Sequence, residues 1–320
     1  MEAHRRHRTT SRTLASPSAD VGVHAAHERL PGGSAICACL AAVVGLTLLL
    51  VACGSSPTPQ PTATVVVTAP PATGSPSATP STASSSVSAT TTLSVYFVRP
   101  IGGAQPDHGP FIATAHRAVP ATGTPATVAM RALLAGPSAR ERSIGMTSVI
   151  PSGTRLLGLT ISSGVATVDL SSEFGAGSRA SDAEVVYTLT QFSTVKTVVL
   201  KVGGTPLADA GGKRSRYEAL TPPIFVERPA PFDTLGTTVK VAGTANVFEA
   251  TFQWKAVDPA GHRIDGGTVT ATSGSGTRGT FAFTVTSDAW PSAWRLVVWD
   301  ASAENGSALH TVRIPLASGG

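Results

Sequence analysis

Apolar and polar positions are arranged in three different ways along this chain. Residues 36–51 are almost continuously apolar, residues 54–92 are small and mostly polar, and the remainder alternates between apolar and polar side chains. Apolar positions two residues apart line one face of a strand, whereas those three or four apart line one face of a helix. The pattern therefore predicts a targeting segment, then a stretch that cannot build a core, then a folded region from about residue 93.

The first folded region, residues 93–207, carries both periods and is predicted to be an α+β domain. Thr124 and Pro125 are placed as the N-cap and first residue of a helix that Gly136 ends. The segment Ser181-Asp-Ala-Glu184 has the spacing of a capping box and is expected to open a second helix. The predicted strands are residues 93–98, 111–119, 156–161, 165–170 and 197–202, and the first helix is residues 126–135.

The second folded region, residues 224–316, shows strand patterns only. Apolar residues alternate clearly along residues 252–256 and 281–285, and Gly, Pro, Asp and Asn separate the patterned segments. Short strands at such regular spacing predict an antiparallel β-sandwich. The expected strands are residues 224–227, 239–244, 250–257, 267–272, 280–285, 294–299 and 309–314.

A lipoprotein signal is indicated by the run Leu50-Val51-Ala52-Cys53, which closes the apolar segment. With 16 residues this segment is short for a membrane-spanning helix, which needs about 20. We expect residues 1–52 to be removed as a signal peptide and Cys53 to carry lipid, palmitate included. The protein is then held on the extracytoplasmic face of the cell membrane. An uncleaved membrane anchor is the alternative.

The stretch after Cys53 is predicted to be a disordered stalk. Of the 39 residues from Gly54 to Thr92, 34 are Gly, Ser, Thr, Pro or Ala and none is charged, so this stretch cannot bury enough apolar surface to fold. The domain organisation that we expect is a signal peptide (1–52), a lipid-anchored Ser/Thr/Pro/Ala linker (53–92), an α+β domain (93–207), a linker (208–223), a β-sandwich (224–316) and a tail (317–320).

Composition argues against several kinds of chemistry. Cys37 and Cys39 lie in the apolar segment and Cys53 takes the lipid, so the mature chain has no free thiol. Its 19 basic and 16 acidic residues are scattered without a basic stripe, which argues against nucleic acid. The four remaining histidines are far apart in sequence, and no nucleophile or phosphate-binding motif has the required context. We predict no catalytic residue, no metal and no cofactor.

Two long segments of the first folded region resemble the GerMN domain of bacterial sporulation and germination lipoproteins. They are MRALLAGPSARERSIGMTSVIPSGTRLLGLTISSGVATVDLSSEF (130–174) and VVYTLTQFSTVKTVVLKVGGTPL (185–207). In the second region, FVERPAPFDTLGTTVKVAGTANVFEATFQWKAVDPAGHRI (225–264) and SGSGTRGTFAF (273–283) resemble the immunoglobulin-like domain of spore-germination lipoproteins. The resemblance implies a compact α+β domain followed by an immunoglobulin-like sandwich, and it brings no catalytic residues.

Three residues are candidates for an interaction surface. Trp290 precedes Pro291 between two predicted strands and is the best candidate for an exposed aromatic side chain, whereas Trp254 and Trp299 are expected in the core. Asn246 and Glu249 flank Phe248 in the segment that carries the resemblance. Glu249 either anchors a turn by accepting backbone hydrogen bonds or faces a partner.

These observations favour a non-enzymatic, lipid-anchored envelope protein that acts as an interaction or assembly module of the sporulation and germination type. Its expected partners are the membrane, through the lipid, and other envelope proteins. The alternative is a module that binds peptidoglycan or another wall glycan through an aromatic platform. An unrecognised hydrolase is a third hypothesis, which the absence of a motif does not remove.

Overall fold

The computed structural model describes residues 89–102, 109–121 and 123–319, all of which belong to one compact unit, residues 80–320. The predictions for the signal peptide, for Cys53 and for the stalk up to residue 88 lie outside the described residues. Within the described part of the chain, no helix is long and apolar enough to span a bilayer.

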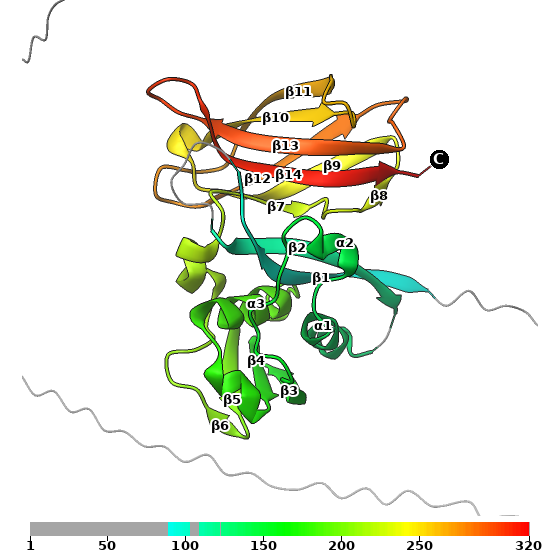
Figure 1. Cartoon of the computed structure of the whole chain (residues 1–320). Helices are drawn as coiled ribbons and strands as arrows, with labels where there is room; N and C mark the ends of the chain where they lie inside the picture. The colour runs from blue at the N-terminus through cyan, green and yellow to red at the C-terminus, as the bar shows by residue number, and fades with distance from the viewer. Residues whose placement is uncertain (1–88, 103–108, 122, 320) are drawn as a thin grey trace, which may run out of the picture. The chain divides into compact units, whose positions relative to one another are not determined.

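The first domain has two sheets and two packed helices, which confirms the predicted α+β class (Figure 1). The long strands β1 and β2 form an antiparallel pair, and a second sheet has the order β3-β4-β5-β6, in which β4 and β5 are parallel. Helices α1 and α3 pack against β1. The elements are β1 (Thr90–Arg99), β2 (Phe111–Pro120), α1 (Pro125–Leu134), α2 (Ala139–Arg142), β3 (Leu156–Ser162), β4 (Val165–Leu170), η1 (Ser172–Ala176), α3 (Arg179–Leu189), β5 (Thr197–Val202) and β6 (Thr205–Pro206).

The hairpin of β3 and β4 follows directly from its sequence. Ala166, Val168 and Leu170 alternate along β4 and are completely buried. Ser163 and Gly164 connect the strands with φ values of 49° and 82°, which suit the right-handed twist of a tight hairpin. The alternation thus turns one face of β4 toward the core.

The start of α3 differs from the prediction. The N-cap is Ser178 rather than Ser181, and the Ser181 side chain forms the return hydrogen bond of the capping box from the third helical position. Glu184, expected to close the box, is instead fully buried and accepts hydrogen bonds from Ser148 Oγ at 2.8 Å and Val149 N at 3.2 Å. At the other helix, Thr124 precedes Pro125 as expected but makes no side-chain capping bond.

The second domain is a sandwich of two antiparallel sheets, as predicted. One sheet has the order β11-β10-β13-β14-β8, with a short parallel contact between β14 and β8, and the other has the order β12-β9-β7. Its core contains Trp254, Phe252, Phe281 and Trp294. The strands are β7 (Ile224–Arg228), β8 (Thr234–Leu235), β9 (Thr238–Ala245), β10 (Thr251–Val257), β11 (Arg263–Thr270), β12 (Gly279–Thr286), β13 (Ala293–Ala301) and β14 (Ala308–Ser318).

The connection between the domains is packed along part of its length. Its 3-10 helix η2 (Arg214–Leu220) contacts α3, and the Tyr217 ring is buried with its hydroxyl donating to Gly211 O at 2.8 Å. The burial of Tyr217 was not predicted, because residues 208–223 are mostly polar and were expected to form a linker.

The core of the first domain also receives a residue from the sandwich. Phe225 on β7 packs against Tyr96 of β1 and Tyr187 of α3, with ring centroids 6.1 Å and 5.7 Å apart. The strands β1 and β2 lie between the helices and the sandwich (Figure 1), and β2 contacts β7. The two domains therefore share buried surface.

Candidate functional site

The three candidate residues do not form one surface. Asn246 and Glu249 follow the end of β9, whereas Trp290 lies beside Thr237, at the start of that strand. Eight residues of strand separate the two positions by about 26 Å. Any contact surface is therefore built at one end of the sandwich or at the other.

Trp290 is half-buried rather than fully exposed. Its ring stacks on the buried Trp294, with centroids 4.2 Å apart and planes 13° from parallel, and its Nε1 donates to Thr237 O at 3.0 Å. The stack on Trp294 and the hydrogen bond to Thr237 O together give Trp290 a packing role. Of the two tryptophans expected in the core, Trp254 is buried, but Trp299 is half-buried on the outer face with Lys255 Nζ 5.5 Å from its ring centroid.

The turn between β9 and β10 presents an aromatic side chain to solvent. Phe248 is 64% exposed at the start of the short 3-10 element η3 (Phe248–Ala250). Glu249 and Ala250 have φ values of 52° and 57°, a region that non-glycine residues adopt only when their surroundings impose it. We call residues 246–250 the β9–β10 tip.

Glu249 does not anchor this turn through its carboxylate. The side chain is exposed and accepts no hydrogen bond from the described residues, and the backbone N–H of Glu249 donates to Ser275 Oγ at 3.0 Å. The two roles considered for Glu249 were to anchor the turn and to face a partner. The exposed, outward-facing side chain beside Phe248 is consistent with the second role.

Asn246 supplies the anchor. Its Nδ2 donates to Glu218 Oε1 at 3.1 Å and its Oδ1 accepts from Gly276 N at 2.9 Å, so one side chain joins η2, the tip and the β11–β12 loop. The N–H groups of Ser275 and Ala250 both donate to Val247 O. These bonds hold the tip in one conformation, which lowers the entropic cost of binding through Phe248.

A charged pair fixes the same end of the sandwich to the connection. Arg278 Nε donates to both carboxylate oxygens of Glu218 at 2.9 Å. Burial acts to raise the pKa of Glu218, but the hydrogen bonds from Arg278 and Asn246 outweigh it and hold the pKa below its usual value. Glu218 therefore stays ionised at neutral pH and keeps Asn246 in place.

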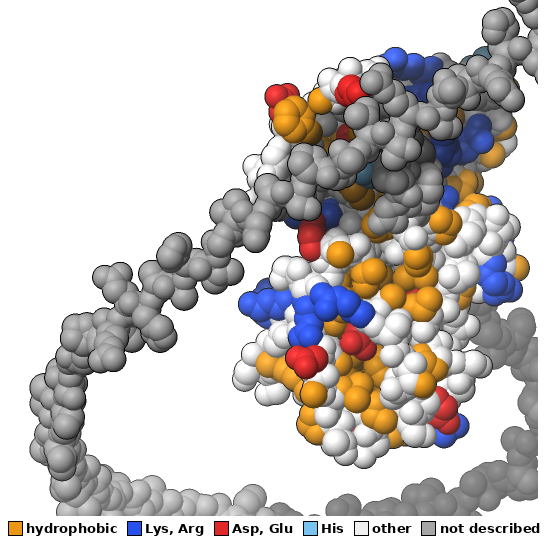
Figure 2. All heavy atoms as spheres, turned by 60° about the vertical axis from the view of Figure 1, so that its left-hand side comes forward, with side chains coloured by type: hydrophobic (Ala, Val, Ile, Leu, Met, Phe, Trp, Pro, Cys, Tyr) orange, Lys and Arg blue, Asp and Glu red, His pale blue; other side chains and the backbone are white. Residues whose placement is uncertain are grey.

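Charged residues that are far apart in sequence form pairs that could not be predicted from their spacing along the chain. His116 Nδ1 lies 2.8 Å from Asp233 Oδ2, which joins β2 to the sandwich, and Arg214 pairs with Glu227 of β7. Among the described residues, no group of three or more His, Cys, Asp and Glu side chains is placed to hold a metal ion. On the face shown in Figure 2, Lys and Arg side chains lie in separate groups, and acidic side chains lie beside more than one of these groups.

Two family models match the chain in sequence. A model described as sporulation and spore germination (Germane) matches residues 94–208, and one described as the immunoglobulin-like domain of bacterial spore germination (Gmad2) matches residues 223–307. The chain thus carries a Germane domain of the GerMN type followed by a Gmad2 domain, a pair of spore-germination modules. These families are germination-associated structural domains and are not known as enzymes. No curated protein matches the chain.

Three solved structures from two bacteria are similar to parts of the chain. The first GerMN domain of the sporulation protein GerM from Bacillus subtilis is 22% identical, with 38% of this chain and 92% of that chain covered and a TM-score of 0.28. The tandem GerMN domains of the same protein are 16% identical, with 63% of each chain covered and a TM-score of 0.31. A putative lipoprotein from Clostridium perfringens is 20% identical, with 42% of this chain and 83% of that chain covered and a TM-score of 0.24.

Proposed function

We propose that this protein is a lipid-anchored, non-enzymatic envelope protein of the spore-germination type that binds another envelope protein through the β9–β10 tip. The observation that carries the proposal is the exposure of the Phe248 ring on a turn that neighbouring side chains hold in place. A large aromatic side chain leaves water when a partner covers it, and such anchors dominate binding energy in many interfaces.

The assembly role is supported by the composition of the folded region. Both domains match germination-associated families, and they are joined by shared aromatic packing and by ion pairs. Two domains that share buried aromatic side chains and also present an exposed tip suit an assembly component.

The lipid anchor is proposed from the run that ends at Cys53, together with the stalk composition that follows it. The test is labelling of the producing cells with a palmitate analogue. Wild-type protein should take up the label and fractionate with membranes, and Cys53→Ala should do neither. Equal labelling of both proteins would contradict the anchor.

The contact role is tested with a photoreactive amino acid placed at position 248 of the full chain. Placement at Ala282, an exposed position on β12, is the matched control. Crosslinking in living cells should yield one recurring envelope protein from position 248 and not from position 282. Binding of that partner should fall at least about tenfold in Phe248→Ala, while the free energy of unfolding changes by less than about 0.5 kcal/mol. A stable variant with unchanged binding would overturn the proposed contact.

Wall-glycan binding remains the second candidate because of one groove on the outer face of the sandwich. Trp299 lines it together with Lys255, Arg295 and Arg313, and the groove has a volume of about 390 Å³. An aromatic ring among cations suits an anionic sugar polymer. Co-sedimentation with purified sacculi separates the two candidates: Trp299→Ala should lose wall binding only if the glycan proposal holds, and Phe248→Ala should not affect it.

A further inference from the structure

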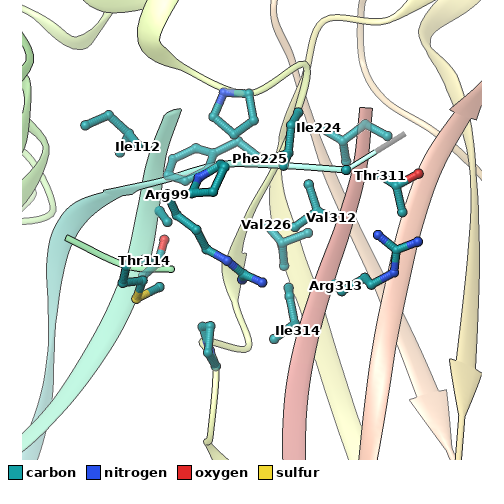
Figure 3. Close-up of a pocket in the computed structure, with 17 residues that line it drawn as sticks. Arg99, Ile112, Thr114, Ile224, Phe225, Val226, Thr311, Val312, Arg313 and Ile314 are labelled. Carbon is teal, nitrogen blue, oxygen red and sulfur yellow. The ribbon is translucent and has the colours of Figure 1, made fainter. Parts of the chain in front are cut away.

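A cavity of about 80 Å³ lies beside the strands where the first domain meets the sandwich. Apolar side chains from three strands form much of its wall: Ile112 of β2, Ile224 and Val226 of β7, and Ile314 of β14. Arg99 at the end of β1 and Arg313 on β14 also border it (Figure 3). None of the described residues that line the cavity is acidic. Two cations therefore border an apolar space, and no carboxylate of the described residues lines it beside them.

Both arginines have hydrogen-bond donors to spare. The Arg99 guanidinium donates from Nε to Ile144 O at 3.0 Å, and its two terminal nitrogens bond to no described residue. Arg313 makes no hydrogen bond or ion pair with the described residues. Its Nη1 lies against Gly102, where an added Cβ would come within 2.6 Å. The absence of a side chain at Gly102 thus leaves room for the Arg313 guanidinium at the rim of the cavity.

Thr114 adds an uncharged donor. This residue of β2 is only 3% exposed, and its Oγ1 is buried without a hydrogen bond to any described residue. Such a group costs free energy, and buried hydroxyls in folded proteins nearly always have a partner. Burial lowers the pKa of Arg99, and the nearby charge of Arg313 lowers it further.

We propose that this cavity binds a carboxylate carried by a short apolar group. Two guanidinium groups and one hydroxyl match the two oxygens of a carboxylate, and the isoleucine and valine side chains cover the apolar group. At about 30 Å³ for each water, the volume holds roughly two or three water-sized groups, which fits the carboxylate and the carbon atom next to it. A phosphate would place further charged oxygens against the apolar wall without donors. The proposal is independent of the β9–β10 tip.

The source of the carboxylate is either a small free acid or the C-terminus of a peptide, and two probes distinguish them. Isobutyrate represents the free acid, and N-acetyl-Ala-Ala represents the peptide end. Isobutyramide and the C-terminal amide of the peptide are the uncharged controls, and inorganic phosphate is the competing anion. Each is titrated into the full-length chain in detergent, with the isoleucine methyl groups observed by NMR. The methyl signals of Ile112, Ile224 and Ile314 should shift saturably with a carboxylate probe, while that of Ile161, which lies outside this cavity, should not.

Three variants test the donors. Arg313→Gln changes an exposed side chain, so the protein should fold normally and bind the carboxylate at least about tenfold more weakly. Arg131→Gln, an exposed position on α1, makes the same change of charge and should bind like wild type. Thr114→Val preserves shape, removes the unpaired hydroxyl, and should weaken binding less than Arg313→Gln.

The proposal is overturned if neither carboxylate probe produces saturable shifts, or if the amides bind as well as the acids. Equal binding by Arg313→Gln and wild type would also overturn it, since the charge at the rim would then have no role. Tighter binding of phosphate than of either carboxylate would reject the assigned ligand class.

Discussion

The guanidinium of Arg214 pairs with the carboxylate of Glu227 across the junction of the two domains, with Nη1 2.6 Å from Oε1. The same guanidinium lies over the rings of Tyr96 and Tyr187, at 5.1 Å and 4.6 Å from their centroids. It also donates to Tyr187 O at 3.1 Å and to Thr190 Oγ1 at 2.7 Å. Because a guanidinium has five donors in one plane, a single side chain joins η2, α3, β1 and β7.

Arg214→Ala should lower the free energy of unfolding by about 2–4 kcal/mol, since it removes the ion pair, both ring contacts and several hydrogen bonds of a mostly buried group. Glu227→Gln retains the shape and should cost less, about 1 kcal/mol. Urea denaturation measures both changes. Arg131→Ala on the exposed face of α1 is the control and should stay within about 0.5 kcal/mol of wild type. Equal stabilities for Arg214→Ala and the control would show that the junction does not depend on this side chain.

Glu184 should make the protein less stable as pH rises through neutrality. Burial raises its pKa from 4.5 to about 7, and hydrogen bonds from Ser148 and Val149 offset only part of this effect. Because the folded state favours the protonated acid, its contribution is fully present below the unfolded pKa and is lost as pH rises through the folded pKa. The loss should be of the order of 3 kcal/mol between pH 4.5 and pH 8.

The measurement is urea denaturation across that pH range, with Glu184→Gln as the comparison because glutamine stays neutral. The variant should show a much flatter profile. Asp182 contributes in the same direction, since burial raises its pKa to about 6 despite Arg216 and Arg179, so some slope should remain. Identical pH profiles for wild type and Glu184→Gln would contradict the assignment. Glu141 and Glu218, whose pKa values are lowered, affect stability at more acidic pH.

The strands of both domains could be predicted because their apolar residues alternate locally. Residues 281–285, for example, became part of β12 with Phe281 and Val285 buried, as their period of two requires. The start of α3 could not be predicted in this way. Two overlapping capping patterns compete there, and the choice depends on Ser148 and Val149, which draw Glu184 into the core from more than 30 residues away.

The candidate site was predictable only in part for the same reason. The segment around Phe248 was found from sequence, but nothing local indicated that Asn246 would hold the tip through Glu218, 28 residues earlier. Nor could sequence position alone show that the loop before β13 folds back, so that Trp290 stacks on Trp294. Contacts between residues far apart decided which polar and aromatic side chains were exposed.

Trp290 should behave as a packing residue. Trp290→Ala removes the stack on Trp294 and the hydrogen bond to Thr237 O, and should lower the free energy of unfolding by about 1–3 kcal/mol. Trp290→Phe keeps an aromatic ring and loses the donor, so its cost should be about 1 kcal/mol. Thermal and urea unfolding of the two variants measure these costs. A fully stable Trp290→Ala protein that lost binding to the partner would reverse this conclusion and restore Trp290 as a contact residue.

The β9–β10 tip should depend on the absence of a side chain at Gly274. A Cβ there would lie 2.4 Å from Val247 O and 2.6 Å from the backbone of Ala250, so the turn that carries Phe248 would have to move. Gly274→Ala should therefore lower the free energy of unfolding by about 2 kcal/mol or more. Like Phe248→Ala, it should also weaken binding of the partner. The matched control is Gly236→Ala, because a Cβ at Gly236 meets no atom within 4 Å and its φ is not in the left-handed region.

Amide hydrogen exchange at Ala250 and Ser275 reports the conformation of the turn directly, since both N–H groups donate to Val247 O. Faster exchange in Gly274→Ala and unchanged exchange in Gly236→Ala are expected. Unchanged exchange in both would show that the tip is not held by this close backbone approach.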